Sequence, residues 1–269
     1  MSDSLSSKGD PWGAKSADWA EVQEPFLEPC YNLVLNICGV GPGTRVLDVG
    51  CGAGKFMEMA SNRGALVTGI DGSAGMIEIA RQRIPRGNIQ SGSMDSLPYP
   101  ANSFELVAGF NSFSHAEDQL DALLEARRVA MPGAPVAITV WAPARPGWAN
   151  EAVFGIMPTI LPDLAGPEAD VVEIGARSDS QPREDPLAGL ARKAGLTPRL
   201  TGDIDCPFVY SDEETLIKGF MSPGPFVEAC RQVGEPAVRS AILSALEQFR
   251  TAAGGYSFTN GFRYVIATA

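Results

Sequence analysis

Three glycines directly after a short apolar run constrain the fold of this chain more than any other feature. Residues 46–49 have the composition of a buried strand, and Gly50, Gly52 and Gly54 follow at alternate positions. Residues 55–62 then predict a helix. Glycine at such a strand-to-helix turn accepts strained backbone dihedral angles and lets the backbone pass close to a ligand. The run therefore predicts a ligand-binding turn at the end of a strand.

Strand and helix signals alternate from this turn to Trp141. Strands are predicted at 45–49, 66–70, 88–90, 104–110 and 136–141, and helices at 55–62, 73–83 and 118–130. A further helical stretch, residues 16–39, precedes them and is divided by Pro25 and Pro29. Alternation at this spacing is typical of a parallel sheet with right-handed helical crossovers.

The regular alternation stops after Trp141. Residues 142–185 contain six prolines and no clear periodicity, and we interpret them as an insertion that covers a site. Regular signals return as a helix at 187–194, a strand near 200–208, a helix at 236–250 and a strand at 262–268. The spacing from Ser211 to Glu214 predicts a capping box before another helix.

One acidic residue stands where a ribose binds in nucleotide-type sites. Asp71 follows Gly54 by 17 positions and ends the second predicted strand. A carboxylate there accepts hydrogen bonds from two ribose hydroxyls. The alternative is a tight turn beside a surface acid, which would make the strand context and the position of Asp71 coincidental.

Composition narrows the range of partners. With 269 residues, 45% of them apolar, the chain can bury one sizeable core or one core and a smaller cap. The formal net charge of -11 disfavours nucleic acid, because an acidic surface repels phosphate backbones. No apolar run approaches the ~20 residues that span a bilayer, and residues 1–10 lack the apolar stretch of a signal peptide.

Cysteine and histidine usage disfavours disulfides and metal. The five cysteines are odd in number and lack CxxC spacing, so neither a disulfide framework nor a structural zinc site is expected. The single histidine, His115, argues against a multi-histidine metal site. A reducing cytoplasm fits this pattern best.

Four motifs in order resemble those of the class I S-adenosylmethionine-dependent methyltransferases, in particular the small-molecule branch that includes ubiquinone and menaquinone methyltransferases. They are LDVGCGAG at 47–54, VTGIDGSAGMIEIAR at 67–81, SGSMDSLPYPANSFELV at 91–107 and FSHAEDQLDALLEARRVAMPGAPVAI at 113–138. The closing stretch GFRYVIAT at 261–268 also fits. Ala134 departs from the family, which usually has a second glycine in that turn.

The resemblance implies a fold and a division of the chain. The fold is a Rossmann-like α/β sheet of seven strands, mostly parallel with the last strand antiparallel, flanked by helices and covered by a helical lid. Residues 1–39 form an arm and lid helices, and residues 40–142 form the cofactor-binding core. Residues 143–185 are a lid insertion, and residues 186–269 complete the sheet with lid helices at 211–253.

The resemblance also implies the residues that bind S-adenosylmethionine. They are Asp48 with the backbone of Gly50, Cys51 and Gly52 for the methionine part, Asp71 with Gly72 for the ribose, Met76, Ser93, Met94 and Asp95 around the adenine, and Asn111 facing the sulfonium and the acceptor. Asp95 would accept a hydrogen bond from the adenine amine. Tyr31 either closes over the cofactor or packs in the core.

His115 has two interpretations. It follows the strand at 104–110, on the side where parallel sheets bind ligands. A pKa near neutrality suits a general base for a phenol or an enol. The alternative is a hydrogen bond that orients the loop. Trp12, Trp19, Trp141 and Trp148 likewise either line an apolar acceptor pocket or simply pack.

The expected function is in-line methyl transfer to an oxygen, carbon or nitrogen atom of a small, largely apolar metabolite. One alternative is a nicotinamide-dependent oxidoreductase, which would need glycine where Lys55 stands in the pattern GxGxxG. The other is a non-catalytic S-adenosylmethionine-binding protein, which would carry damaged motifs. The sequence does not fix the acceptor or its reacting atom, nor does it decide between a monomer and a homo-oligomer.

Overall fold

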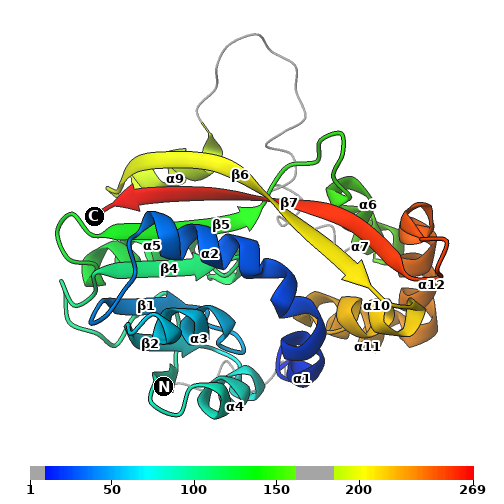
Figure 1. Cartoon of the computed structure of the whole chain (residues 1–269), viewed down its shortest axis with the longest axis horizontal. Coiled ribbons are helices and arrows are strands. Elements are labelled where there is room, and N and C mark those ends of the chain that lie inside the picture. The colour runs from blue at the N-terminus through cyan, green and yellow to red at the C-terminus, as the bar shows by residue number, and fades with distance from the viewer. Residues whose placement is uncertain (1–9, 162–184) are drawn as a thin grey trace, which may run out of the picture.

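The computed structural model describes residues 10–161 and 185–269, and seven strands in them form one sheet. The order across the sheet is β3-β2-β1-β4-β5-β7-β6 (Figure 1). The bounds are β1 Arg45–Val49, β2 Leu66–Asp71, β3 Asn88–Ser91, β4 Leu106–Phe110, β5 Pro135–Trp141, β6 Thr197–Tyr210 and β7 Tyr256–Thr268. The first five strands are parallel and β7 runs antiparallel to β5 and β6, which confirms the predicted fold class.

Helices cover both faces of the sheet, because the parallel strands are apolar on both sides. On one face Val46 of β1 joins a core cluster with α2 (Glu28–Ile37), α3 (Lys55–Asn62) and α4 (Ala74–Arg83). On the other face Leu47 and Val49 join a cluster with α5 (Gln119–Val129) and α9 (Pro186–Lys193). Asp48 therefore points to the same face as α2 and α3.

The strands β6 and β7 are much longer than predicted. Their ladder continues to the pair Tyr210–Tyr256, whereas β5 leaves β7 at the pair Trp141–Phe262. Figure 1 shows this two-stranded ribbon running from the sheet out to α10 and α12. The extension buries alternating aromatic side chains, including Phe208 and Phe258. The aromatic alternation extends beyond the segments predicted as strands.

A cap of short helices surrounds the outer part of this ribbon. Its elements are α6 Asn150–Phe154, α7 Ile156–Ile160, α10 Glu213–Phe220, α11 Gly224–Val233, α12 Glu235–Leu246 and the 3-10 turn η5 Glu247–Phe249. Most of the predicted insertion at 143–185 lies outside the described residues. Every helix within residues 10–161 and 185–269 falls short of the length and apolarity needed to cross a membrane.

The helical stretch at 16–39 is divided, as the two prolines predict. It consists of α1 Ser16–Asp18, the π-helical turn η1 Trp19–Gln23, the 3-10 turn η2 Glu24–Leu27 and then α2. The η1 turn packs against α10, and the hydroxyl of Tyr210 donates a hydrogen bond of 2.8 Å to the carboxamide of Gln23. This segment therefore joins the part of the sheet near α2 and α4 to the cap.

Side-chain caps begin α4 and α10. The hydroxyl of Ser73 accepts from the backbone N–H of Met76 and caps α4, which lies within the helix predicted at 73–83. The capping residue of α10 is Asp212, one position later than predicted, and it accepts from Thr215 N at 2.8 Å. The Ser211 hydroxyl does not cap the helix. It donates instead to the Asp212 carboxylate, which itself accepts from the backbone of the first turn.

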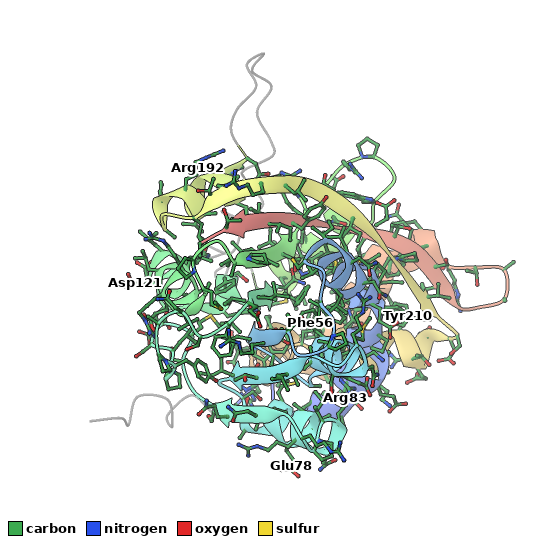
Figure 2. The ribbon with its side chains drawn as sticks, turned by 60° about the vertical axis from the view of Figure 1, so that its left-hand side comes forward. Phe56, Glu78, Arg83, Asp121, Arg192 and Tyr210 are labelled. Carbon is green, nitrogen blue, oxygen red and sulfur yellow. The ribbon has the colours of Figure 1, made fainter. Side chains whose placement is uncertain are left out.

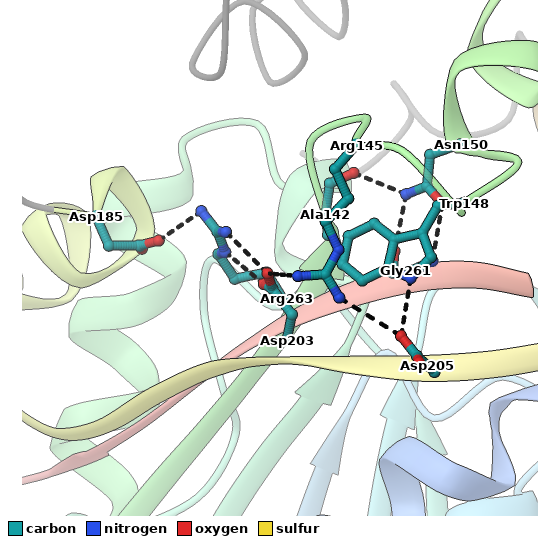
Figure 3. Close-up of polar contacts among 9 residues, drawn as sticks. All are labelled: Ala142, Arg145, Trp148, Asn150, Asp185, Asp203, Asp205, Gly261 and Arg263. Carbon is teal, nitrogen blue, oxygen red and sulfur yellow. Dashed lines mark hydrogen bonds and ion pairs between the residues drawn. The ribbon is translucent and has the colours of Figure 1, made fainter. Parts of the chain in front are cut away.

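A polar network on the outer face of β6 and β7 holds both ends of the inserted segment (Figure 3). The Arg263 guanidinium pairs at 2.8 Å with both Asp203 and Asp185. Arg145 lies 3.4 Å from the ring centroid of Trp148, whose indole N–H donates to Asp205. Trp148 packs on this outer face, on the opposite side of the sheet from Asp48.

Replacing Arg263 by methionine should lower the free energy of unfolding by about 1–2 kcal/mol, because Asp185 loses its cation and Asp203 keeps only the longer ion pair with Arg145. Urea unfolding followed by circular dichroism measures the change. Arg199→Met, at an exposed arginine of β6 that contacts the Thr268 hydroxyl, is the control. It should change stability by less than about 0.5 kcal/mol. Equal effects of the two variants would contradict a structural role for the network.

Candidate functional site

The glycine turn after β1 is tightly packed on one side and open on the other. Gly50 and Gly52 have φ values of 74° and 51°, in the left-handed region. A Cβ on Gly50 would collide with the side chain of Ser112, whose hydroxyl donates to the carbonyl of Val49 at 2.6 Å. A Cβ on Gly52 would meet nothing closer than 3.9 Å, namely the Glu24 carboxylate and the Trp19 indole. The turn therefore presents its open side at Gly52.

Asp71 is fixed at the end of β2 by two backbone groups. Its carboxylate oxygens accept from Gly52 N and from Ser73 N, each at 2.8 Å. Burial raises the pKa of Asp71, and these two hydrogen bonds oppose the rise. The carboxylate thus links the glycine turn to the start of α4 and retains acceptor capacity for a ligand.

Asp48 is a buried acid without a cation beside it. One carboxylate oxygen, Oδ1, is buried and has no hydrogen-bond partner in the described part of the chain. Burial, and then the charges of Asp71 and Glu24, raise the pKa of Asp48 well above its ordinary value of 3.8. An unpartnered carboxylate oxygen in such a place is costly, so the arrangement favours a cationic or hydrogen-bond-donating ligand.

Glu24 is a third acid at this site, and sequence reasoning missed it. Its carboxylate accepts from the backbone N–H of Lys55 at 3.2 Å and forms an ion pair with Arg83. Arg83, labelled in Figure 2, also donates to the carbonyl of Ala53 at 2.9 Å. Burial raises the pKa of Glu24 and the guanidinium opposes the rise. Lys55 and Arg83 lie 31 and 59 positions from Glu24 along the chain, so no local sequence pattern indicated that Glu24 belongs to the site.

The N-terminal segment brings two tryptophans and His115 together over the site. Trp12 packs edge-on against His115 with ring centroids 5.5 Å apart, and against Trp19 at 5.4 Å. Asp10 accepts from the Ser73 hydroxyl at 3.0 Å, which holds this segment to α4. The charge of His115 acts to lower the pKa of Asp71, so the imidazole lies near that carboxylate. His115 itself is exposed.

Asn111 and Tyr31 lie close to the same edge of the sheet. Asn111 has a φ of 53°, its backbone N–H donates to the carbonyl of Thr139, and its carboxamide oxygen is buried without a partner. Tyr31 packs against Phe110 and Phe56 with ring centroids 4.8 and 6.0 Å apart. Burial raises the pKa of Tyr31, and the charges of Glu24 and Asp48 add to the rise. Tyr31 therefore packs in the core beside both acids.

The residues assigned to the adenine form their own local contacts. The Ser93 hydroxyl donates to the Asp95 carboxylate at 2.8 Å and accepts from Asp95 N at 3.1 Å. Met94 packs against the cluster of α5, and Met76 is buried. Cys51 is buried, while Gly72 is exposed with open space around it. The adenine assignment stays a prediction.

The site as a whole suits a ligand with positive charge and hydroxyl groups. Asp48, Asp71 and Glu24 surround the open side of the glycine turn, and Arg83 is paired with one of them. A sulfonium, a primary ammonium and two ribose hydroxyls match such acceptors. A pyrophosphate would instead add negative charge to a cluster of carboxylates, which is unfavourable.

Comparisons with known proteins agree with this chemistry. A family described as "Methyltransferase domain" matches residues 47–138. The ubiquinone/menaquinone biosynthesis C-methyltransferase of Xanthomonas campestris is 30% identical over 184 residues, covering 61% of this chain and 72% of that protein. The 27-O-demethylrifamycin SV methyltransferase of Amycolatopsis mediterranei is 28% identical, covering 69% and 67%. The crystal structure of the YcgJ protein of Bacillus subtilis, 20% identical, has a TM-score of 0.56 over 88% of this chain and 97% of that one.

Asp48→Asn should stabilise the ligand-free protein at neutral pH by about 1 kcal/mol or more, because it removes a buried carboxylate without a cation. The folded state holds the proton on Asp48 more tightly than the unfolded state does. Wild type therefore loses stability as the pH rises from about 4 through the raised pKa of Asp48. The variant cannot ionise at this position and avoids that loss.

Urea unfolding of both proteins between pH 4 and pH 8 measures the difference. The variant should match wild type near pH 4 and exceed it at pH 8. Asp121→Asn, at the exposed start of α5 (Figure 2), should show no such divergence. A variant that is less stable than wild type at every pH would show that Asp48 has a stabilising partner.

Proposed function

This chain belongs to the class I S-adenosylmethionine-dependent methyltransferases, and we propose that it methylates a small, largely apolar metabolite at an oxygen, carbon or nitrogen atom. One observation supports a largely apolar acceptor: aromatic side chains form a layer beyond the carboxyl end of β5. Phe208 stacks on Phe26 with centroids 4.6 Å apart, and Trp141 lies 4.5 Å from Phe262. These rings lie on the same face of the sheet as Asp48.

The proposed cofactor contacts follow from the chemistry of each group. Asp48 and the backbone at Gly50, Cys51 and Gly52 bind the methionine part, and Asp71 with Gly72 beside it binds the ribose hydroxyls. Asp95 accepts from the adenine amine beside Ser93, Met94 and Met76. The Asp71 carboxylate is already oriented by two backbone hydrogen bonds, which supports its role.

When bound, the cofactor supplies an electrophilic methyl group on a sulfonium. The protein's contribution is alignment and exclusion of water. Asn111, whose unpartnered carboxamide oxygen lies at the end of β4, orients the groups that meet there. Trp12 and Trp19 cover the site from the N-terminal side and keep it dry.

The names of two relatives favour oxygen or carbon as the atom of the acceptor that receives the methyl group. One is a C-methyltransferase of ubiquinone and menaquinone biosynthesis, and another acts at a position named 27-O. We therefore favour an oxygen or a carbon over a nitrogen.

Other parts of the proposal concern partners, location and the division of the chain. The net charge of -11 supports the absence of nucleic acid, and five free cysteines support a reducing, cytoplasmic location. Residues 40–142 are proposed as the cofactor-binding core. Residues 1–39, 143–185 and 211–253 are proposed as the lid.

Asp71→Ala tests the cofactor assignment. Losing two charge-assisted hydrogen bonds costs ~2–4 kcal/mol, so S-adenosylhomocysteine should bind on the order of 30–1000 times more weakly. Titration calorimetry measures the dissociation constant, and NAD serves as a ligand that should not bind. Glu78→Ala, at an exposed acid of α4 (Figure 2), should leave the affinity unchanged. Unchanged affinity in a folded Asp71→Ala variant would show that Asp71 does not bind the ribose and only links the two loops.

His115→Ala tests whether a general base takes part. The exposed imidazole packs edge-on against Trp12, which favours a positioning role. Turnover should then fall by less than about tenfold, and the pH profile should keep its shape. A general base would instead give a loss of about 100-fold or more and remove the acidic limb of the profile. Steady-state rates from pH 5 to pH 9, at saturating cofactor, distinguish the two.

A further inference from the structure

Buried polar atoms without partners form a diagonal row over four neighbouring strands of the sheet, in which Asn260 lies four positions beyond Tyr264, the register partner of Thr139. Asp48, Asn111, Thr139 and Asn260 each contain at least one such atom within the described residues. They belong to or directly follow β1, β4, β5 and β7, which are neighbours in that order. Strand register places Asp48, Thr139 and Asn260 on the same face. Native proteins rarely leave such atoms unsatisfied, so the row indicates groups that a ligand completes.

Asn260 is the member of this row farthest from the cofactor-binding strands. It is fully buried, and neither its carboxamide nitrogen nor its oxygen has a partner. Its neighbours on the same face are Phe258 and Phe262 along β7 and Cys206 across on β6. The nearly parallel rings of Phe208 and Phe262 have centroids 6.5 Å apart. The carboxamide therefore stands in an aromatic environment that offers it no hydrogen bond.

Asn150 shows what a structural asparagine looks like in the same region. It is also fully buried, yet its nitrogen donates to the carbonyls of Ala142 and Gly261 at 2.8 and 2.9 Å. Its oxygen accepts from Gly261 N at 2.7 Å. Asn150 thus ties α6 to β7 one residue away from Asn260. The contrast argues that Asn260 is not held in place by the fold.

The charged groups near this part of the ribbon point to its other face. Arg263 pairs with Asp203 and Asp185, and Asp205 accepts from the Trp148 indole (Figure 3). These ribbon residues alternate with Asn260 and Cys206 along β7 and β6, so they face outward. A charged ligand group beside Asn260 would therefore lack a counter-ion. The ligand group that matches the Asn260 carboxamide is therefore neutral and has both a hydrogen-bond donor and a hydrogen-bond acceptor.

We propose that Asn260 binds the polar end of the methyl acceptor and that this acceptor is a neutral aromatic molecule with a hydroxyl beside a second oxygen. The hydroxyl donates to Oδ1 of Asn260, and the second oxygen accepts from Nδ2. Rings of Phe208, Phe262 and Trp141 pack against the apolar part of the acceptor. The Thr139 hydroxyl lies between Asn111 and Asn260 in the row and adds a polar contact nearer the cofactor. This inference rests on the proposed methyltransferase function.

The test compares Asn260→Leu with Asn150→Leu in protein saturated with S-adenosylhomocysteine. The probes are 2,3-dihydroxynaphthalene, naphthalene and 2-naphthoate, measured by calorimetry. Wild type should prefer the diol over naphthalene by about tenfold, since two hydrogen bonds are gained. The ionised 2-naphthoate should bind no more tightly than naphthalene. Asn260→Leu should abolish the preference for the diol and leave the cofactor affinity unchanged.

Thermal melting of the ligand-free proteins separates recognition from structure. Asn260→Leu should melt at the wild-type temperature or above it, because it removes an unsatisfied amide. Asn150→Leu should melt about 4 °C lower or more, because it removes three hydrogen bonds to the backbone and leaves the Ala142 carbonyl and the Gly261 N–H without the partner they have in the wild type. If Asn260→Leu melts as low as Asn150→Leu or fails to fold, Asn260 is structural and the inference is overturned.

The same experiment distinguishes this inference from the proposed function. Failure of S-adenosylhomocysteine to bind wild type would overturn the function, and the inference with it. Normal cofactor binding with equal affinity for diol and naphthalene would overturn the inference alone. So would a preference for the diol that persists in Asn260→Leu.

Discussion

The carboxylate of Asp71 is the contact on which the cofactor site depends. It accepts one hydrogen bond from the glycine turn after β1 and one from the start of α4, at 2.8 Å each. These two loops belong to different βα units, and their relative position sets the shape of the site. The Ser73 hydroxyl extends the link, because it accepts from Met76 N and donates to Asp10. These two side chains therefore connect the glycine turn and the start of α4 to the N-terminal segment that packs over them.

The site places two further acids, Asp48 and Glu24, in its buried part. Asp48 and Glu24 are both buried, and burial raises the pKa of each. Arg83 compensates Glu24, whereas Asp48 depends on what binds. The free protein is consequently less stable than its packing allows, and a cationic cofactor restores the difference when it binds. Function and stability oppose each other at Asp48.

Sequence pattern predicted the core of the fold because its signals are local. The glycine turn, Asp71 and the alternating strands and helices up to Trp141 all depend on spacing along the chain, and the structure reproduces them. Long-range partnerships were not predictable. Glu24 meets Arg83 from 59 positions away, and Asn260 differs from Asn150 only in what the fold places beside it. The length of β6 and β7 was underestimated, since their outer halves pair only with each other.

The continuous ladder of β6 and β7 sets how the cap is attached to the sheet. The same two strands serve as the edge of the sheet and as the support of α10 and α12. Rotating the cap away from the sheet would bend this continuous ribbon, so the cap and the edge of the sheet are mechanically linked. The segment from Asp10 to Gln23 is attached to α4 and β6 by side chains instead. The two coverings of the site are thus held differently: continuous backbone pairing carries the cap, whereas individual side-chain hydrogen bonds carry the N-terminal segment.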